Sequence, residues 1–264
     1  MARALQFNRK SFYLKSKLET KDKALAIKIE EQHATEDDTL GQKKLGKILK
    51  TGKNRIKRVM RKYGITARRR KKKYIYPGKS DLVFQNIAND SEVIELNINI
   101  IFSDMFEFRL EDNSKLRGCF ALHKQTRQIL ALIFDYAMKA ELVVSTIQSI
   151  DFGFFALWHT DQGKSYGAEK TQAKLLEKGF LASMSRAGTP TDNGYAERFV
   201  GIFKHSVVRK RKYNSLGDFL KEAEHWINFY NHRRPHEGIG QIAPAKYAQM
   251  NGIQVVPYLS NFTV

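Results

Sequence analysis

Residues 99–110 read NIIFSDMFEFRL, residues 118–124 read GCFALHK, and residues 127–137 read RQILALIFDYA. The three runs are rich in β-branched and aromatic side chains, which are typical of strands. Asp112 and Asn113 separate the first run from the second, and Lys124 and Gln125 separate the second from the third. Because both gaps are short and hold turn-forming residues, the sequence predicts an antiparallel meander of three strands.

Helical and strand-like segments alternate after this meander. The sequence predicts a helix over about 139–150, a strand at FFALWHTD (154–161), a helix over 170–178 that ends at Gly179, and a strand at FLASMS (180–185). Antiparallel strands that are followed by strands alternating with helices indicate a mixed sheet. We therefore predict an α/β domain in which helices flank a mixed sheet.

Three carboxylates stand out against this scaffold. Asp104 interrupts an apolar strand, Asp161 ends the strand in WHTDQG, and Glu197 lies near the start of a predicted helix in TDNGYAERF. The chemistry of α/β sheets gathers at the carboxyl ends of strands, where Asp161 stands. Hard divalent cations prefer carboxylate oxygens, and a pair of such cations can cleave a phosphodiester. The alternative interpretation of each single acid is a surface carboxylate.

The helix that carries Glu197 has two predicted stripes. The apolar stripe consists of Ala196, Phe199, Val200, Phe203 and Val207. The adjoining stripe consists of Asn193, Glu197, Gly201 and Lys204, at i, i+4, i+8 and i+11. Because glycine weakens a helix interior, the second stripe indicates a close approach, such as a metal-bound phosphate backbone lying along the helix. A solvated Lys204 and a tolerated Gly201 are the alternative.

Two further patterns follow this helix. The RKRK run at 209–212, which includes Arg209 and Lys210, adds a cationic patch. Residues 215–230 then predict a strongly amphipathic helix, whose apolar stripe consists of Leu216, Phe219, Leu220, Ala223, Trp226, Ile227 and Tyr230. We expect Trp226 to lie in the core.

The net charge of +19 is concentrated in the first third of the chain. Residues 1–80 carry 25 Lys or Arg against 7 Asp or Glu, whereas residues 81–264 carry 21 against 20. Three apolar sets at helical spacing predict three short helices there: Leu25 and Ile29; Leu45, Ile48 and Leu49; and Ile56, Val59, Met60 and Tyr63. Breaks at Thr51-Gly52 and at Gly64 separate and end them, which predicts a helix-turn-helix-like unit.

Cations cover the polar side of this unit. The third predicted helix carries Arg55, Arg58 and Lys62, and a basic arm follows that consists of Arg68, Arg69, Arg70, Lys71, Lys72 and Lys73. So dense a basic block repels itself unless a polyanion neutralises it, and such an arm suits phosphates better than base edges. The sequence therefore predicts nucleic-acid binding; a solubilising or disordered tail is the alternative.

The composition excludes several classes of protein. Cys119 is the only cysteine, so a disulfide framework and a cysteine-rich zinc site are excluded. No apolar run reaches the length of a membrane span, and the N-terminus has no long apolar stretch of the kind found in secretory signals. We expect a soluble intracellular protein.

Three longer motifs point to a known family: HTDQGKSY (159–166), SMSRAGTPTDNGYAERFVGIFK (183–204) and FYNHRRPHEGIGQIAPAKY (229–247). They resemble the catalytic domain of the DDE transposases and integrases, above all the second-frame protein of insertion sequences of the IS-three group. The 35 residues between Asp161 and Glu197 agree with the spacing of that family. The segments MARALQFNRKSFYLKSK and TLGQKKLGKILKTGKNRIKRVMRKYGITARR resemble the start and the helix-turn-helix of such proteins.

The resemblance implies an RNase H-like fold with Asp104, Asp161 and Glu197 as catalytic, metal-binding triad. Asp104 stands in Ile101-Phe102-Ser103-Asp104 where the family usually has Trp-x-Thr-Asp, and Asp135 and Asp151 are rival first acids. The resemblance also implies that Lys204 contacts end DNA and that Asn193, with Asp192, is structural or positions DNA. Mg²⁺, with Mn²⁺ as a substitute, would occupy the site as two ions.

The expected function is metal-dependent 3′-end nicking and strand transfer by a DNA transposase. Its expected partners are double-stranded DNA at element ends and target, further copies of this chain, and the first-frame protein or a frameshift fusion, in the prokaryotic cytoplasm at the nucleoid. A catalytically inactive or regulatory DNA-binding relative is the alternative, followed by an RNase H-type nuclease. We expect an N-terminal segment (1–20), a helix-turn-helix-like domain (21–66), a basic arm and linker (67–95), the catalytic core (96–212) and a C-terminal helix and tail (213–264).

Overall fold

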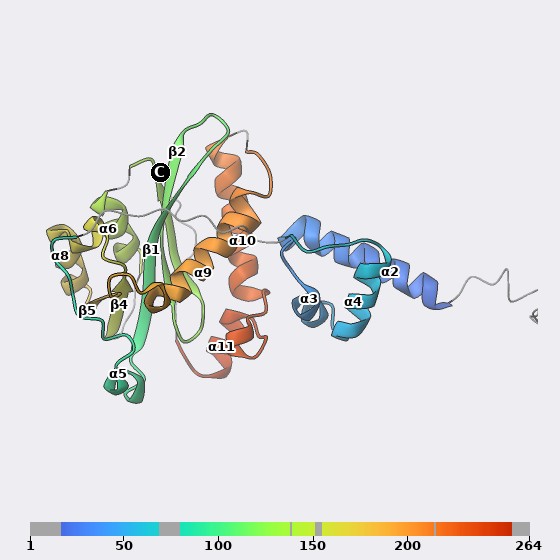
Figure 1. The fold of residues 1–264 in the computed structure, drawn as a ribbon, viewed down its shortest axis with the longest axis horizontal. Helices are drawn as coiled ribbons and strands as arrows, with labels where there is room; N and C mark the ends of the chain where they lie inside the picture. Colours follow the sequence, from blue (N-terminus) through green and yellow to red (C-terminus); the bar gives the residue numbers. More distant parts are fainter. Residues whose placement is uncertain (1–16, 69–79, 138, 151–154, 214, 255–264) are drawn as a thin grey trace, which may run out of the picture. The chain divides into compact units, whose positions relative to one another are not determined.

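A computed structural model describes residues 17–68, 80–137, 139–150, 155–213 and 215–254. The chain divides into two compact units, Met1–Arg69 (unit 1) and Arg70–Val264 (unit 2), which are shown in Figure 1. In the described ranges, no helix combines the length and the apolar character that crossing a bilayer requires. Residues 69–73 of the predicted basic arm and the rival acid Asp151 lie outside the described residues.

Unit 1 is a small bundle of three α-helices, α2 (Lys17–Gln32), α3 (Gln42–Ile48) and α4 (Lys53–Lys62), with a π-helical turn at His33–Asp37. Its core is made of the apolar residues whose spacing predicted the helices, together with Ala26 and Leu40: the buried members are Leu25, Ala26, Ile29, Leu40, Leu45, Ile56 and Val59. Gly64, at φ +69°, follows the end of α4 as predicted, because glycine takes the left-handed conformation without steric cost.

Unit 2 is built on a five-stranded mixed sheet with the order β3-β2-β1-β4-β5. The predicted meander is confirmed as β1 (Asn99–Arg109), β2 (Lys115–His123) and β3 (Ile129–Asp135), which pair antiparallel. The later strand β4 (Ala156–Thr160) pairs parallel with β1, and β5 (Phe180–Met184) pairs parallel with β4. Parallel pairing requires crossover connections, and helices supply them here.

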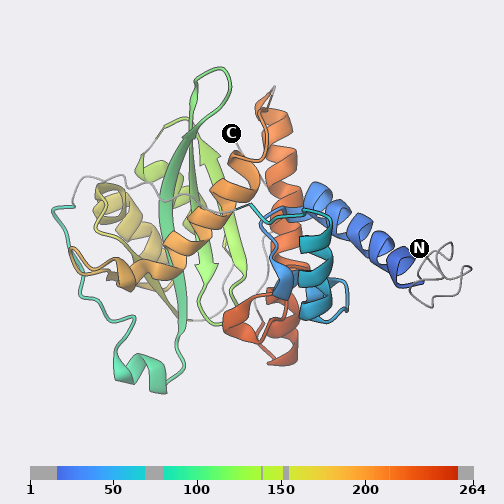
Figure 2. The same ribbon diagram turned by 45° about the vertical axis from the view of Figure 1, so that its right-hand side comes forward.

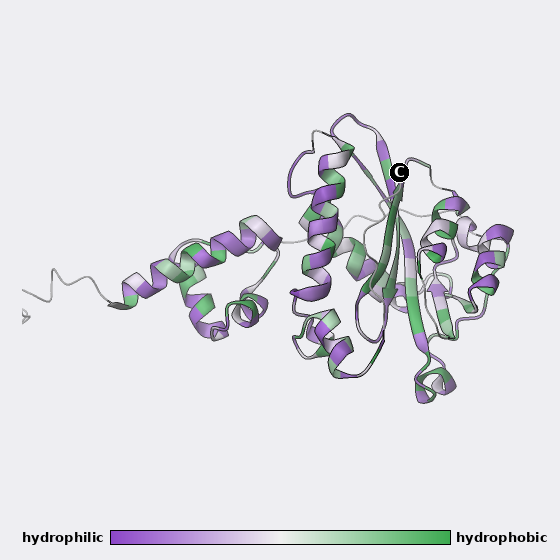
Figure 3. Cartoon of the chain, turned by 180° about the vertical axis from the view of Figure 1, so that it is seen from behind, coloured by the Kyte–Doolittle hydropathy of each residue, from purple (hydrophilic) through white to green (hydrophobic). Residues whose placement is uncertain are grey.

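Helices cover both faces of this sheet (Figure 1). On one face, α6 (Ala140–Gln148), α7 (Lys164–Gly167) and α8 (Glu169–Glu177) pack on side chains such as Ile101, Cys119 and Trp158. On the other face lie α9 (Gly194–Phe203) and α10 (Leu216–His232), and α9 runs diagonally across the sheet in both ribbon views (Figures 1 and 2). Figure 3 shows strands that are largely hydrophobic and an α10 banded in both colours, as an amphipathic helix requires.

The second face is packed mainly with aromatic rings. Phe120 meets Phe199 of α9 at 4.4 Å between centroids, and Phe106 meets Phe203 at 5.5 Å. Trp226 of α10 is fully buried and packs on Phe203 at 5.5 Å, so its predicted place in the core is confirmed. Because side chains alternate along a strand, Phe102, Asp104 and Phe106 all point toward this helical layer.

Several features differ from the sequence prediction. The helix of Glu197 ends at Phe203 and continues as a π-helical turn, Lys204–Val208, instead of an uninterrupted α-helix. Three short helices were not predicted: α5 (Ser91–Glu95), α7, and α11 (Pro244–Met250). These helices are too short for the helical spacing of apolar residues to be recognised in the sequence. In α10, Phe229 is buried although it lay outside the predicted stripe, whereas Leu216 and Leu220 are only half-buried. The 3-10 turns Pro190–Asn193 and Glu237–Ile239 complete the element list.

Candidate active site

The register of β1 and β4 brings two of the predicted acids side by side. Phe102 of β1 pairs with His159 of β4 in the parallel ladder. Asp104 lies two residues further along β1, and Asp161 directly follows the end of β4 at Thr160, so continuing this register brings the two acids to neighbouring positions. Neighbouring strands lie about 4.8 Å apart, and both residues fall on the strand positions that face α9. The backbone thus fixes this pair without any long-range loop.

Glu197 comes to the pair from the helix above. It stands in the first turn of α9, between Tyr195, whose ring lies 5.0 Å from that of Phe102, and Phe199 on Phe120. These contacts hold α9 over β1 and β2, while the Glu197 side chain itself is exposed. The negative charge of Glu197 raises the pKa of Asp104, which shows that the two carboxylates are within electrostatic reach.

The surroundings of Asp104 and Asp161 disfavour the charged forms of both carboxylates. Burial raises the pKa of Asp104 well above its ordinary value, and the charges of Asp161 and Glu197 raise it further. Burial also raises the pKa of Asp161. Within the described residues, the hydrogen bonds that oppose these shifts come from the backbone: Met105 N–H donates to Asp104 Oδ1 at 2.7 Å, and Gly163 N–H donates to Asp161 Oδ1 at 2.9 Å. A positive charge placed between these acids would relieve their repulsion.

The loop after Asp161 is closely fitted. A Cβ at Gly163 would stand 2.9 Å from Asp161 Oδ1, so glycine leaves room for the turn that folds the carboxylate back on its own backbone. Gln162 donates to the carbonyl of Ser185 at 3.0 Å, and Ser80 N–H donates to the carbonyl of Gln162 at 2.6 Å. The loop is therefore tied to the residue that follows β5 and to the irregular segment at Ser80.

Lys204 is the nearest predicted cation to the acids. It is half-buried, and its Nζ lies 5.5 Å from the centre of the Phe106 ring. Burial and the charge of Arg209 lower its pKa, whereas Asp104 and Glu107 oppose that shift. Lys204 directly follows the end of α9 and begins the π-helical turn, so the predicted stripe with Glu197 and Gly201 stays a prediction at this residue.

The other predicted binding residues are distributed differently. Asn193 is buried, and its Oδ1 has no hydrogen-bond partner in the described part of the chain. Lys210 pairs with Glu222 of α10 at 3.0 Å, whereas Arg209 is exposed. Arg55, Arg58, Lys62 and Arg68 lie in unit 1, and each faces an acid of that unit.

Asp192, which the resemblance marked together with Asn193 as structural or DNA-positioning, is a polar anchor of unit 2. Buried Asp192 accepts hydrogen bonds from Arg186 Nε at 2.9 Å and Nη2 at 3.0 Å, and from Asn86 Nδ2 at 2.7 Å. Arg186 lowers the pKa of Asp192 strongly. The only signal in the sequence was the Asp-Asn pair before the Glu197 helix. Asp192 thus clamps the segment around Asn86 to the turn that leads into α9.

Two histidines near the site are held by structural hydrogen bonds. His159 Nδ1 lies 2.9 Å from Ser183 Oγ and its Nε2 lies 3.0 Å from Ser185 Oγ. His123 lies between Thr126 Oγ1 and Asn99 Oδ1, at 2.9 and 3.0 Å. Burial lowers the pKa of each to about 4. Both are neutral parts of the framework at neutral pH.

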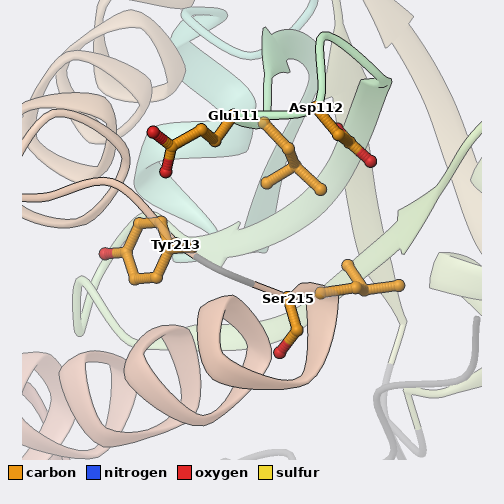
Figure 4. Close-up of a pocket in the computed structure, with 6 residues that line it drawn as sticks. Glu111, Asp112, Tyr213 and Ser215 are labelled. Atoms are coloured by element: carbon orange, nitrogen blue, oxygen red, sulfur yellow. The ribbon is translucent and has the colours of Figure 1, made fainter.

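The hollow drawn in Figure 4 is a separate feature. It encloses about 360 Å³ between the β1–β2 turn, with Glu111 and Asp112, and the start of α10, with Tyr213 and Ser215. None of the three predicted acids lines it. In the described ranges, no three His, Cys, Asp or Glu side chains stand close enough together to form a ready-made metal site. The candidate site is therefore the open surface around Asp104, Asp161 and Glu197.

Comparison with known proteins defines the class of the chain. Residues 178–244 match the family described as Integrase core domain, a stretch that includes Glu197 and Lys204. An uncharacterized 31.7 kDa protein of insertion element IS407 from Burkholderia multivorans is 24% identical over 74% of this chain and 68% of its own length. The transposase for insertion sequence element IS904 from Lactococcus lactis is 31% identical over 35% of this chain and 37% of its own length.

Part of the chain is therefore similar to the integrase core domain and to insertion-element transposases, as the predicted resemblance has it, and the mixed five-stranded sheet confirms the predicted α/β fold class. Apart from the IS407 protein, the match spans about a third of the length of such relatives. Among solved structures, a chain of the simian T-cell lymphotropic virus intasome in complex with PP2A regulatory subunit B56 gamma aligns with a TM-score of 0.49 and 13% identity, over 91% of this chain and 80% of that chain.

Proposed function

We propose that unit 2 is the catalytic core of a DDE-type transposase that nicks DNA at the 3′ ends of an insertion sequence and joins those ends to a target. The observation that carries the proposal is that the charges of Asp161, at the end of β4, and of Glu197, on α9, both act on buried Asp104 of β1 and raise its pKa. Matches to transposases by sequence support the same conclusion.

The residues fit divalent cations. Asp104, Asp161 and Glu197 offer oxygen donors only, and the mutual repulsion that raises the pKa of Asp104 is what a bound cation would remove. When bound, two Mg²⁺ ions, or Mn²⁺ in their place, would supply the Lewis acid that activates water for nicking and the freed 3′-OH for transfer. We assign Asp104, Asp161 and Glu197 as the holding residues.

The other residues of the site position these groups and the DNA. The N–H groups of Met105 and Gly163 orient the two aspartates. The aromatic layer holds α9 against the sheet and so keeps Glu197 close to them. Lys204, at the end of α9, brings a cation beside the acids for a phosphate of end DNA. Arg209 extends this cationic edge toward solvent.

The partners follow from this chemistry. We propose double-stranded DNA as substrate, at element ends and at the target, and an assembly of several copies because two ends must be joined together. The first-frame protein or a frameshift fusion would supply recognition of the ends. A noncatalytic DNA-binding relative would bind the same DNA without cutting it, and an RNase H-type nuclease would prefer an RNA–DNA hybrid.

The test is a nicking and strand-transfer assay on duplex DNA carrying the terminal inverted repeats, with Mg²⁺ or Mn²⁺. We expect Asp161→Asn and Glu197→Gln to abolish both reactions and to leave DNA binding intact. Asp135→Asn is the matched control, because Asp135 lies at the end of the edge strand β3, away from the β1–β4 pair. Wild-type activity in either triad variant, or loss of activity in the control alone, would overturn the assignment.

A further inference from the structure

The cations of α4 divide into two groups with different surroundings. Arg58 donates to Asp22 of α2 through Nη1 at 2.6 Å and Nη2 at 2.7 Å, and the Asp22 carboxylate is fully buried. One turn further on, Lys62 and the Tyr63 hydroxyl both donate to Glu19. Arg58 lowers the pKa of Asp22 through this hydrogen bond. Arg58 and Lys62 therefore fasten α4 to α2, and together with Arg55, whose Nε lies 4.0 Å from Asp22 Oδ1, we call them the paired flank.

Lys53, Lys57 and Arg61 form the second group, which we call the open flank. They follow each other at intervals of four residues, so they line one side of α4, and all three are exposed. None of them has an ion-pair partner among the described residues of unit 1. No acid occurs anywhere between residues 39 and 80, so neighbours along the chain cannot neutralise them either.

The turn before α4 holds this flank in a fixed orientation. A Cβ at Gly46 of α3 would stand 2.7 Å from the carbonyl oxygen of Thr51, and Thr51 N–H donates to the Gly46 carbonyl at 2.8 Å. Only glycine allows the end of α3 to approach the turn so closely. Lys47 and Lys50, both exposed, stand at the end of α3 and in this turn, next to the start of the open flank.

We propose that the open flank of α4, Lys53, Lys57 and Arg61, is the surface that grips the phosphate backbone of duplex DNA, and that the paired flank holds the helix in place without touching DNA. This replaces the sequence prediction that Arg55, Arg58 and Lys62 bind DNA. The physical reason is that a cation already paired with a carboxylate, buried Asp22 for Arg58 and half-buried Glu19 for Lys62, gains little from a phosphate, whereas an exposed, unpaired cation releases counterions when it meets one. The proposal rests on the proposed function only in taking DNA as the polyanion.

The test compares K57Q/R61Q with R58Q/K62Q in the full chain. The two variants lose equal charge from adjacent positions on one helix. Each phosphate contact contributes a slope of about −0.9 to the dependence of log K on log salt. We expect K57Q/R61Q to flatten the slope for a short random duplex by about two contacts and R58Q/K62Q to leave it unchanged. Equal slopes in the two variants, or a flatter slope in R58Q/K62Q, would overturn the proposal.

A measurement on the unmodified protein covers the case in which R58Q/K62Q loosens unit 1. Amine-reactive labelling should lose access to Lys53 and Lys57 when duplex is added and keep its access to Lys62. Protection of Lys62 alone, or protection only by a single strand of equal length, would contradict the duplex assignment. Because the measurement needs no catalysis, a failed nicking assay with protection of Lys53 and Lys57 would overturn the proposed function alone.

Discussion

Carboxylates in the two units meet opposite surroundings. In unit 1, Asp22 is buried beside Arg58 and accepts two of its hydrogen bonds, which lowers the pKa of Asp22. In unit 2, Asp104 accepts only the N–H group of its neighbour Met105 while Asp161 and Glu197 repel it, and its pKa is raised. The first arrangement stabilises the fold and the second opposes it.

The contrast separates structural acids from candidate functional ones. A protein gains nothing for its stability from holding acids together, so an arrangement of that kind marks a site that another charge is meant to complete. Asp192 shows that the difference lies in the partner and not in the unit. Asp192 belongs to unit 2, yet it accepts hydrogen bonds from Arg186 and Asn86 just as Asp22 accepts them from Arg58.

The largest expected effect comes from Asp104→Asn. Loss of a direct metal ligand should lower nicking at least about 100-fold, the upper end of the loss caused by removing supporting partners of a metal site. The same change removes repulsion from Asp161 and Glu197, so the midpoint of thermal unfolding in cation-free buffer should rise by about 2–4 °C, as expected for about 1 kcal/mol in a domain of this size. Nicking assays and thermal melts measure the two effects.

If Asp104 belongs to a functional site and not to the structural acids, Asp104→Asn should lower activity and raise stability. Asp104→Ala is the companion variant, since it removes both charge and donor atoms. A destabilised Asp104→Asn protein with full activity would place Asp104 among the structural acids.

The second effect is expected at Asp192. Asp192→Asn should lower the free energy of unfolding by about 1–3 kcal/mol at neutral pH, because it removes a buried charged acceptor of several hydrogen bonds. The pKa of Asp192 is lowered in the folded protein, so its stabilisation is present above the ordinary pKa of about 3.9 and is lost as pH falls through the lowered value. The difference between variant and wild type should therefore shrink below about pH 4.

Denaturant unfolding at several pH values checks this prediction. Exposed Asp81→Asn is the matched control and should show no such difference. A gap between Asp192→Asn and wild type that widens in acid would contradict the pairing with Arg186.

The smallest effect is expected at Asp22. Asp22→Asn weakens the hold of Arg58 on α2 and should speed amide exchange in α2 and α4 while leaving the sheet of unit 2 unchanged. The effect is modest because the Arg58 side chain is 45% exposed and water replaces part of the lost interaction. Exchange that accelerates equally in β1 and β4 would show that the ion pair is not local to unit 1.

Local patterns predicted most of the elements correctly. The alternation and aromatic content of residues 99–110 predicted β1, and Gly179, at φ +74°, ends α8 where the sequence placed its end. Both signals are local, because strand periodicity and left-handed glycine depend on neighbouring residues alone. The π-helical turn at Lys204–Val208 has no such signal, since it adds a residue per turn without changing composition.

For the candidate site, the sequence predicted all three acids, Asp104, Asp161 and Glu197, from residue type and from the resemblance to a family, but not which strands would bring them close together. Asp104 and Asp161 are brought together by the pairing of β1 with β4, which residues 99–110 and 154–161 cannot specify separately. The pairing of Arg58 with Asp22 and of Lys62 with Glu19 joins residues 36 and 43 positions apart, beyond the reach of helical spacing. The prediction that Arg58 and Lys62 bind DNA was made without knowledge of these partners.

The sequence by itself determined the type of each segment, the basic character of the first third and the identity of the acids, because periodicity, charge and turn residues act over short distances. Only the tertiary structure decided which charges meet. Packing set Asp104 beside Asp161, buried Asp22 under Arg58 and left Lys53, Lys57 and Arg61 open to solvent. The sequence therefore determines the charge of each residue, whereas the role of that charge depends on its burial and on its partner. Both are set by chain segments that lie far apart in the sequence.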